Sequence, residues 1–346
     1  MGLPIRHRAD MLAELTRGHT LAAIAGSSGK STVTGMTGWI LEGAGFDPVV
    51  VNGAELIQWS GEGRLGNTRW GAGSVWVVEV DESDRSLLLF DPDWAVVTNV
   101  SKDHFDVAAT ARLFSDFEAR VKSGVIRGRG EGGVLAGFEP RIGCQGSEFD
   151  FRGAPVRLRL PGLHNAENAY MAAALSEKLG ASPGAIRERL GEFKGIRRRF
   201  EIVSKAQGIT VVDDYAHNPA KIFAAWTAAR LTGTRVIGIW RPHGYGPLAA
   251  MMEELAETFA ALCRGGDRLR VLPVYDAGGT ANRSVGANDL VERVRRLDAS
   301  AETASDESEL IRRIGDEARE GDVILVMGAR DPGLPRLARD IADGIA

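Results

Sequence analysis

Residues 25–32, with the sequence Ala-Gly-Ser-Ser-Gly-Lys-Ser-Thr, combine glycines, a lysine and hydroxyl groups in a pattern typical of phosphate binding. Glycines allow consecutive backbone N–H groups to turn towards phosphate oxygens, and the lysine adds a full positive charge. The hydroxyl of Ser31 can reach a Mg²⁺ ion that accompanies the phosphates. The common pattern has a further glycine five residues before Gly29, where this chain has Ile24. A plain glycine turn that leads into a helix is therefore the alternative interpretation.

The segments on either side of this loop have the layout that phosphate binding needs. Leu21–Ile24 is a short apolar run, which predicts a buried strand. Residues 33–44 contain no proline and end among Gly43 and Gly45, which predicts a helix with glycine stops. In this order the positive end of the helix faces the loop. We therefore predict that the loop binds phosphate groups.

Acidic and polar side chains follow two further predicted strands, at residues 75–80 and 94–100. Such apolar strands are typical of a parallel sheet covered on both faces, where ligands bind at the carboxyl ends of the strands. Glu79 ends the first strand and is a candidate Mg²⁺ ligand, with a solvated acid as the alternative. His104 follows the second strand and is a candidate contact to metal or phosphate, with a surface histidine as the alternative.

The second half of the chain repeats the alternation of strands and helices. Residues 164–178 predict an alanine-rich helix with Asn165 and Asn168 in its first turns, and Gly195 interrupts the pattern after it. Beyond Gly195 we predict strands at 209–212, 235–240, 268–272 and 322–327, and helices at 219–231, 248–262, 287–297 and 307–319. The fold class is therefore α/β: a P-loop-containing parallel-sheet central domain at 1–195, followed by a Rossmann-like C-terminal domain at 196–346.

Four of the six histidines lie in short polar segments at predicted ends of strands or helices: His104, His164, His217 and His243. His217 and His243 belong to the second domain. A site assembled from both domains and closing over a nucleotide would explain this distribution. The alternative is that loops simply carry polar residues.

Composition limits the other functions of the chain. With 346 residues, 44% of them hydrophobic and 25% charged, it is typical of a globular protein with two domains. A net charge of −4 gives no general attraction to nucleic acid. No apolar run approaches the roughly 18–20 residues that cross a bilayer, so we expect no membrane segment. Cys144 and Cys263 form no C-x-x-C pair, so we expect free thiols in a reducing cytoplasm.

Six motifs occur in the order found in Mur ligases, and the sequence resembles this family over most of its length. Among its members, the alanine-adding ligases are the most similar. The motifs are Gly26-x-x-Gly29-Lys30-Ser31-Thr32, Glu79-Val80-Asp81-Glu82-Ser83-Asp84, Thr98-Asn99-x-x-x-Asp103-His104-x-Asp106, Gly162-x-His164-Asn165-x-x-Asn168, Arg198-Arg199-Phe200 and Asp213-Asp214-Tyr215-Ala216-His217-Asn218-Pro219.

The resemblance implies that the chain uses ATP and Mg²⁺ to join a small-molecule carboxylate to an amine through an acyl phosphate. It implies nucleotide binding by Gly26, Ser28, Gly29, Lys30, Ser31, Thr32, Asn165, Asn168, Arg199 and Asp214, with the two asparagines at the adenine end. It implies metal binding by Ser31, Glu79 and His104. It also implies catalytic roles for Lys30, Glu79, His104 and His217, with His217 and His243 near the incoming amine or the acyl phosphate. Lysine and metal must neutralise charge before a carboxylate can approach a phosphate.

The chain departs from the family pattern in three places. The first predicted strand begins at residue 21, so we expect the N-terminal UDP-sugar-binding domain of the three-domain members to be lacking. The acid is then not a UDP-sugar, or a partner chain supplies its binding. The Pro242-His243 pair is not followed by arginine, which leaves specificity for L-alanine open, with Arg241 or Arg330 as possible replacements. Lys122 lies too far downstream of the Asp-His motif to be assigned as a carbamylated lysine.

Two other functions stay open at this point. One is a ligase similar to folylpolyglutamate synthase, which also lacks the sugar-binding domain, although the muramate-type motifs argue against it. The other is a nucleotide-binding subunit that is active only with a partner chain. ATP hydrolysis that depends strictly on a small-molecule acid would separate a ligase from such a subunit.

Overall fold

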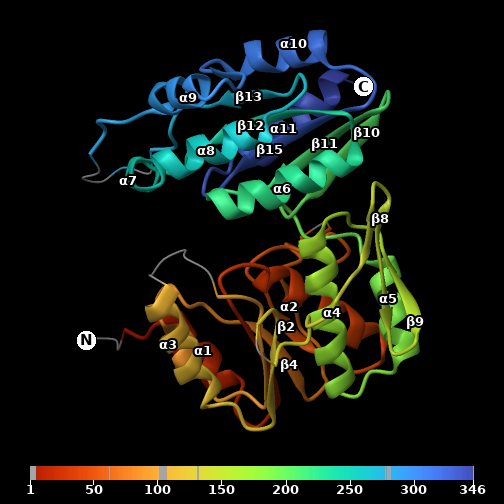
Figure 1. Cartoon of the computed structure of the whole chain (residues 1–346). Coiled ribbons are helices and arrows are strands. Elements are labelled where there is room, and N and C mark those ends of the chain that lie inside the picture. The colour runs from red at the N-terminus through yellow and green to blue at the C-terminus, as the bar shows by residue number, and fades with distance from the viewer. Residues whose placement is uncertain are drawn as a thin grey trace. The chain divides into compact units, whose positions relative to one another are not determined.

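The computed structural model describes residues 5–61, 63–100, 107–130, 132–276, 278 and 282–345. The chain divides into two compact units, Met1–Ile142 with Gly146–Ile196, and Arg197–Ala346 with Gly143–Gln145. Each unit is built on a six-stranded, mainly parallel sheet with helices packed on it (Figure 1). The predicted α/β class with two parallel-sheet units is confirmed.

The sheet of the first unit has the strand order β3-β2-β4-β1-β5-β6, and β2–β3 is its one antiparallel pair. The strands are β1 (Thr20–Ala25), β2 (Val49–Val51), β3 (Thr68–Arg69), β4 (Val75–Glu79), β5 (Trp94–Val97) and β6 (Gly124–Arg127). Ala22 and Ile24 of β1 join one apolar cluster, whereas Leu21 and Ala23 join the cluster on the opposite face. Because both faces are covered, the strands are apolar along nearly their whole length.

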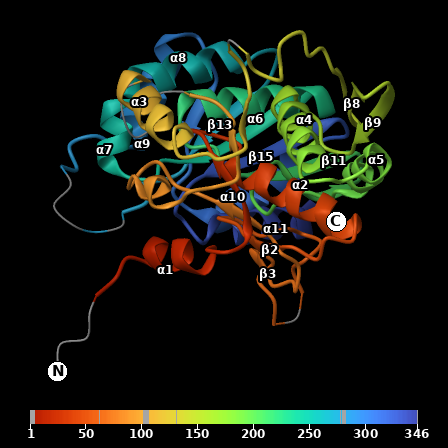
Figure 2. The same cartoon turned by 90° about the horizontal axis from the view of Figure 1, so that it is seen from below.

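Three helices of the first unit pack side by side on one face of this sheet. The helices of the unit are α1 (Arg8–Leu15), α2 (Lys30–Gly43), α3 (Val107–Glu118), α4 (Leu163–Lys178), α5 (Pro183–Glu192) and the 3₁₀ helix η1 (Ser86–Leu89). α2, α4 and α5 lie together in both views (Figures 1 and 2). A Cβ atom on Gly35 of α2 would lie 2.6 Å from the Ile196 side chain, so glycine permits this close approach.

A small additional sheet packs against α4, and the sequence did not predict it. It consists of β7 (Arg141–Gly143), β8 (Gly146–Phe151) and β9 (Ala154–Leu158). Phe149 and Phe151 of β8 each lie 5.7 Å from Tyr170 of α4, measured between ring centroids, with the rings edge to face. These aromatic contacts fix the sheet to the helix.

The sheet of the second unit has the order β10-β11-β15-β12-β13-β14, with β10–β11 antiparallel and the other neighbours parallel. The strands are β10 (Glu201–Ala206), β11 (Ile209–Asp214), β12 (Arg235–Arg241), β13 (Arg268–Val271), β14 (Ala301–Thr303) and β15 (Asp322–Gly328). The helices are α6 (Pro219–Thr232), α7 (Tyr245–Ala250), α8 (Met252–Leu262), α9 (Ala287–Arg296), α10 (Glu307–Glu317) and α11 (Leu334–Ile345). Apolar clusters cover both faces of this sheet too.

One predicted helix of the second unit is wrong. Residues 248–262 do not form a single helix, because the backbone at Met251, with φ −113° and ψ 10°, leaves helical geometry between α7 and α8. By contrast, α6 begins at Pro219 as predicted. The Asn218 side chain accepts a hydrogen bond from the backbone N–H of Lys221, and proline occupies the first helical position.

Candidate active site

The loop between β1 and α2 has a backbone that only glycine adopts easily at two positions. Gly26 has φ +129° and Gly29 has φ +88°. A Cβ atom on Gly26 would lie 2.0 Å from Thr98 Oγ1, so this position has no room for any side chain. Gly29 precedes α2 and provides no side-chain cap. The first N–H groups of α2 therefore lack a side-chain cap, which suits an anion-binding helix terminus.

The end of β5 holds this loop in place. Asn99 Oδ1 accepts a hydrogen bond from the Ser28 backbone N–H at 3.1 Å, and Asn99 Nδ2 donates to the Ser28 carbonyl at 3.0 Å. The Thr98 hydroxyl donates to the same carbonyl at 2.5 Å. Our sequence reasoning gave Thr98 and Asn99 no role. Their position at the carboxyl end of the strand beside β1 was the signal that could have revealed one.

Glu79 lies beside the serine of the loop. Ser31 Oγ donates to Glu79 Oε1 at 3.2 Å, and the Gly53 backbone N–H donates to Glu79 Oε2 at 2.7 Å. Asn52 Nδ2 donates to the Ser31 carbonyl at 3.1 Å and so fixes the start of α2. The structure thus brings the two described candidate metal ligands together. A hydroxyl and a carboxylate are oxygen donors of the kind that Mg²⁺ prefers, so the residues fit this ion.

His104, the third candidate metal ligand, lies outside the described residues. Within the described ranges the structure contains no group of three or more histidine, cysteine, aspartate or glutamate side chains placed to hold a metal ion. The described part of the candidate metal site is therefore Ser31 and Glu79.

Lys30 forms hydrogen bonds with the start of the loop and with the segment that follows β4. Its Nζ atom donates to the Gly26 carbonyl at 2.8 Å and to Glu82 Oε2 at 2.7 Å. The Glu82 carboxylate is buried, with 3% of its side chain exposed. The sequence did not predict the contact between Glu82 and Lys30. The signal that could have revealed it is the acidic segment after β4, to which Glu82 belongs.

The two asparagines of α4 lie in different surroundings. The Asn168 amide lies against the loop, because a Cβ atom on Gly29 would be 2.5 Å from Asn168 Oδ1. Asn165 is buried and its Nδ2 atom donates to the Pro161 carbonyl at 2.8 Å. Beside them, burial lowers the pKa of His164 to about 4, so this imidazole is neutral at physiological pH. Of these three residues of α4, Asn168 is the one that the described contacts place against the predicted nucleotide loop.

In the second unit, Asp214 holds two backbone segments together at the end of β11. Its Oδ2 atom accepts a hydrogen bond from the Phe200 N–H, and its Oδ1 atom accepts one from the Ala216 N–H, both at 2.7 Å. Burial raises the pKa of Asp214, against the opposing charge of Arg199. Phe200 has φ +48°, so the Asp214 carboxylate supports a strained turn.

The candidate residues Arg199 and His217 both contact the ring of Tyr215. The Arg199 guanidinium lies 4.9 Å and the His217 ring 5.6 Å from the centroid of the Tyr215 ring. His217 also lies 4.9 Å from His243 between centroids, and its Nε2 atom is 3.5 Å from Lys221 Nζ. Two imidazoles and a lysine therefore form a cluster at the ends of β11 and β12.

Arg241, one suggested contact for the amine substrate, is already paired. Its guanidinium forms ion pairs with Asp331 and Glu307. Two carboxylates already more than balance its one positive charge. The structure therefore does not support a role for Arg241 in holding a further carboxylate.

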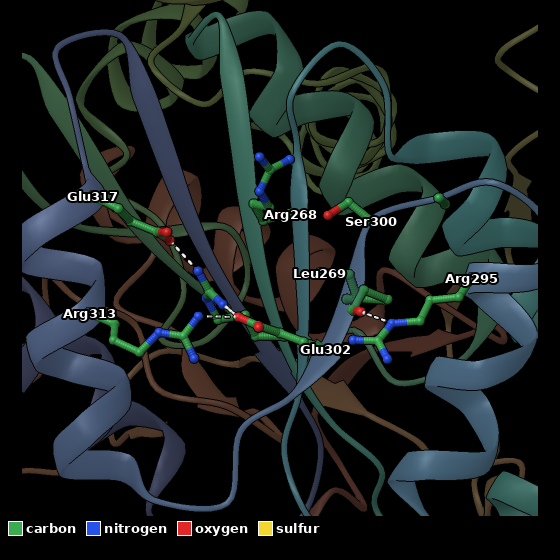
Figure 3. A pocket seen from close by; sticks show the side chains of 10 residues that line it. Arg268, Leu269, Arg295, Ser300, Glu302, Arg313 and Glu317 are labelled. Carbon is green, nitrogen blue, oxygen red and sulfur yellow. Dashed lines mark hydrogen bonds and ion pairs between the residues drawn. The ribbon is translucent and has the colours of Figure 1, made fainter.

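A cavity of about 290 Å³ lies elsewhere in the second unit, at the amino-terminal ends of β13 and β14 (Figure 3). Arg270, almost fully buried there, forms ion pairs with Glu302 and Glu317, and Arg313 also pairs with Glu302. In parallel sheets ligands bind at the opposite, carboxyl ends of the strands. We therefore treat this network as part of the fold and not as the candidate site.

Comparison with known proteins decides the family. The model of the Mur ligase middle domain matches residues 24–114, and that of the Mur ligase glutamate ligase domain matches residues 198–330. The chain is 35% identical to the UDP-N-acetylmuramate–L-alanine ligase of Phenylobacterium zucineum, over 95% of this chain and 76% of that protein. It is 32% identical to the enzyme of the same name from Synechococcus elongatus, over 97% and 77%. The chain belongs to the Mur ligase family.

Solved structures show the same fold. The UDP-N-acetylmuramate–alanine ligase of Thermotoga maritima matches with a TM-score of 0.77 and 23% identity, over 97% of this chain and 77% of that one. Folylpolyglutamate synthase of Mycobacterium tuberculosis, solved with ADP and AMPPCP, matches with a TM-score of 0.69 and 17% identity, over 96% and 92%.

Membership of the family confirms the predicted resemblance and the class of reaction. Mur ligases are ATP-dependent ligases that form a C–N bond between an acid and an amino acid, and this chain is such an enzyme. Their substrates are small molecules. In the described part of the chain, no helix is long and apolar enough to cross a bilayer. Cys144 and Cys263 are free thiols, as predicted.

Proposed function

We propose that this Mur ligase activates a small-molecule carboxylate as an acyl phosphate with ATP and transfers the acyl group to an amino acid. The observation that carries this proposal is the group formed by Lys30, Ser31 and Glu79 around a glycine loop. The loop supplies N–H donors, the lysine a cation, and the serine and glutamate oxygen donors. A reaction between two anions requires such hydrogen-bond donors and positive charges, because they stabilise the negative charge that is brought together.

In the proposed site, the backbone from Gly26 to Thr32, including Ser28, cradles the phosphates, and Asn168 extends the nucleotide site next to Gly29. Asn165 shapes the same end of α4 through its hydrogen bond to Pro161. We propose residues 1–195 as the central ATP-binding domain and 196–346 as the C-terminal domain.

Ser31 and Glu79 would hold Mg²⁺, and we propose His104 as a further ligand. The bound ion supplies positive charge that makes phosphate oxygens easier for an anionic carboxylate to approach. The residues of the chain orient it: Gly53 fixes Glu79, and Asn52 fixes Ser31.

We propose that Arg199 and Asp214 bind the nucleotide from the second domain and that His217 acts near the amine. The pairing of His217 with His243 and Lys221 supports this role, because neutral imidazoles can accept the proton that the attacking amine releases. We expect Asp214 to act mainly through the backbone that it holds.

The substrates are the finer part of the proposal. Relatives that share 35% and 32% identity carry the name UDP-N-acetylmuramate–L-alanine ligase, so this pair is the first to test. A partner chain that helps to bind the acid stays a prediction, as does action in the cytoplasm, where ATP is available. The fold shared with folylpolyglutamate synthase keeps a folate-type acid as the second candidate.

The test is phosphate release from Mg-ATP with pairs of acids and amines, UDP-N-acetylmuramate with L-alanine being the reference pair. We expect release only when an acid is present, because an acyl phosphate cannot form without one. Release with the reference pair supports the muramate assignment. Release only with another pair gives the enzyme a different acid. ATP binding without acid-dependent release for any pair would contradict the ligase proposal and favour a subunit that needs its partner.

A further inference from the structure

Glu82 is a buried carboxylate whose charge is balanced by the lysine of the phosphate-binding loop. Its side chain is 3% exposed, and its Oε2 atom lies 2.7 Å from Lys30 Nζ. Among the described residues, Lys30 is the one side chain that forms a hydrogen bond or an ion pair with this carboxylate. Moving one partner out of a buried ion pair is costly, because it leaves the other charge uncompensated.

A second contact, within the loop itself, also holds the Lys30 ammonium group in place. Its Nζ atom bridges the Gly26 carbonyl, at 2.8 Å, and Glu82, and 15% of its side chain is exposed. A phosphate that binds in the loop draws the lysine ammonium towards its oxygens. The Glu82 carboxylate and the phosphate therefore compete for the same cation.

Glu79 places a second carboxylate next to the same loop, with its Oε1 atom 3.2 Å from Ser31 Oγ. A nucleotide without a metal would bring several negative charges to a site bordered by two carboxylates. Negative charges that lie side by side repel strongly where water is partly excluded. A nucleotide that carries a divalent cation brings the compensating charge with it.

From these contacts we propose that Glu82 makes the loop select the metal complex of the nucleotide over the free nucleotide. Glu82 holds Lys30 in the nucleotide-free enzyme. When a phosphate ligand draws Lys30 away, Glu82 loses its positive partner, so it weakens the binding of any phosphate ligand that does not bring a replacement positive charge. Glu82 is thus a positioning residue for Lys30. This inference rests on the proposed function, because it assumes that nucleotide phosphates occupy this loop, but its test needs no turnover.

The experiment is a calorimetric titration of ATP into the wild type and into Glu82→Gln, once with MgCl₂ and once with EDTA. We expect metal-free ATP to bind Glu82→Gln at least about 10-fold more tightly than it binds the wild type, because the buried charge is removed. The Kd for Mg-ATP should change much less. The ratio of the metal-free Kd to the Mg-ATP Kd should therefore fall about 10-fold.

Asp81→Asn is the matched control. It removes the same charge one residue away, but the Asp81 carboxylate accepts a hydrogen bond from the Ser83 N–H at 3.0 Å and forms no ion pair with Lys30. We expect Asp81→Asn to leave the ratio of the two Kd values unchanged. An equal fall in that ratio for both variants would overturn the proposal, because general electrostatics would then explain it. An unchanged ratio in Glu82→Gln would overturn it too.

A second variant covers the case in which Glu82→Gln does not fold, which a thermal melt would reveal. Glu82→Asp keeps the charge but shortens the side chain by one methylene, so it weakens the contact with Lys30. We expect its Kd ratio to be lower than the ratios of the wild type and Asp81→Asn. The fall should be smaller than the fall of about 10-fold expected for Glu82→Gln. A ratio equal to that of the wild type overturns the proposal. Failure of the wild type to bind Mg-ATP at all would instead contradict the proposed function.

Discussion

The two large sheets of this chain both end in charged side chains, but the charges are arranged in different ways. In the first unit, Lys30 has one acidic partner among the described residues, Glu82, which lies in the segment that follows β4. In the second unit, Arg198 contacts the Asp213 carboxylate at 3.5 Å and donates to the Gly328 carbonyl at 2.7 Å. Arg241, at the end of β12, pairs with two carboxylates.

This difference indicates how each region works. A flexible lysine with one acidic partner can exchange that partner for a ligand, whereas an arginine fixed by several acceptors stays in place. We infer that the first region binds and releases charge, and that the second region mainly shapes rigid loops. Substitutions in the first region should therefore lower activity most strongly, whereas substitutions in the second region should mainly lower stability.

The largest effect is expected from Lys30→Ala. Loss of the cation at the phosphate should lower kcat/KM by about 10³-fold, because charge stabilisation in a partly dry site contributes most to such reactions. The melting temperature should fall as well, because the variant leaves the buried Glu82 carboxylate without its positively charged partner. Phosphate release and a thermal melt measure the two properties. Lys205→Ala, an exposed lysine on β10, is the control. Turnover near that of the control would remove the loop from the mechanism.

Asp214→Ala should act mainly on stability. Its two oxygens accept hydrogen bonds from the Phe200 and Ala216 N–H groups, and alanine leaves both donors without this partner. We expect a loss of about 3–5 kcal/mol in the free energy of unfolding, measured with urea. Asp214→Asn, which keeps one acceptor oxygen, should lose about half as much. If Asp214→Ala kept wild-type stability but bound ATP poorly, Asp214 would contact the nucleotide directly and not act through the backbone that it holds, and the contrast between the two regions would fail.

The sequence predicted the first region better than the second for a physical reason. Residues 25–32 carry the whole phosphate-binding pattern in consecutive positions, so the glycine spacing and the Lys-Ser pair indicate the loop directly. The alternation of apolar strands and helices likewise predicted both sheets. The contacts of Asn99 with Ser28 and of Glu82 with Lys30 join segments 71 and 52 residues apart. Which side chain meets which across such distances depends on strand order, and a single sequence does not encode that order locally.

The small sheet β7–β9 and the break at Met251 show the same limit. The strands of the small sheet are short, and Phe149 and Phe151 pack against Tyr170 of α4, which is distant in sequence. A pattern of hydrophobic residues does not reveal this partner. For residues 248–262 the pattern is apolar on both sides of Met251, so it predicts one helix although the backbone forms two. The functional roles of all the candidate site residues, among them His104, Asn165 and Arg199, stay predictions.

A smaller effect should appear in the pH dependence of the second unit. Burial raises the pKa of Asp213 to about 7, against the pull of Arg198. Between pH 3.8, the ordinary pKa, and pH 7, the folded state binds more protons than the unfolded state. The stabilisation of the folded state by this proton is complete below about pH 4 and is lost as the pH rises through 7. Asp213→Asn should therefore gain about 2–3 kcal/mol relative to the wild type between pH 4.5 and 7.5. Parallel stability curves for the two proteins in urea would show that Asp213 does not titrate in this range.

The smallest effect should come from the first unit and have the opposite sign. Burial lowers the pKa of His164 from 6.5 to about 4, so the folded state binds fewer protons than the unfolded state between these values. The stabilisation is complete above about pH 6.5 and is lost as the pH falls through 4. His164→Gln should therefore gain about 1–2 kcal/mol relative to the wild type when the pH is lowered from 7.5 to 4.5, as measured by urea unfolding. A relative gain in the other direction would mean that His164 is charged in the folded enzyme, and α4 would then present a cation beside the nucleotide loop.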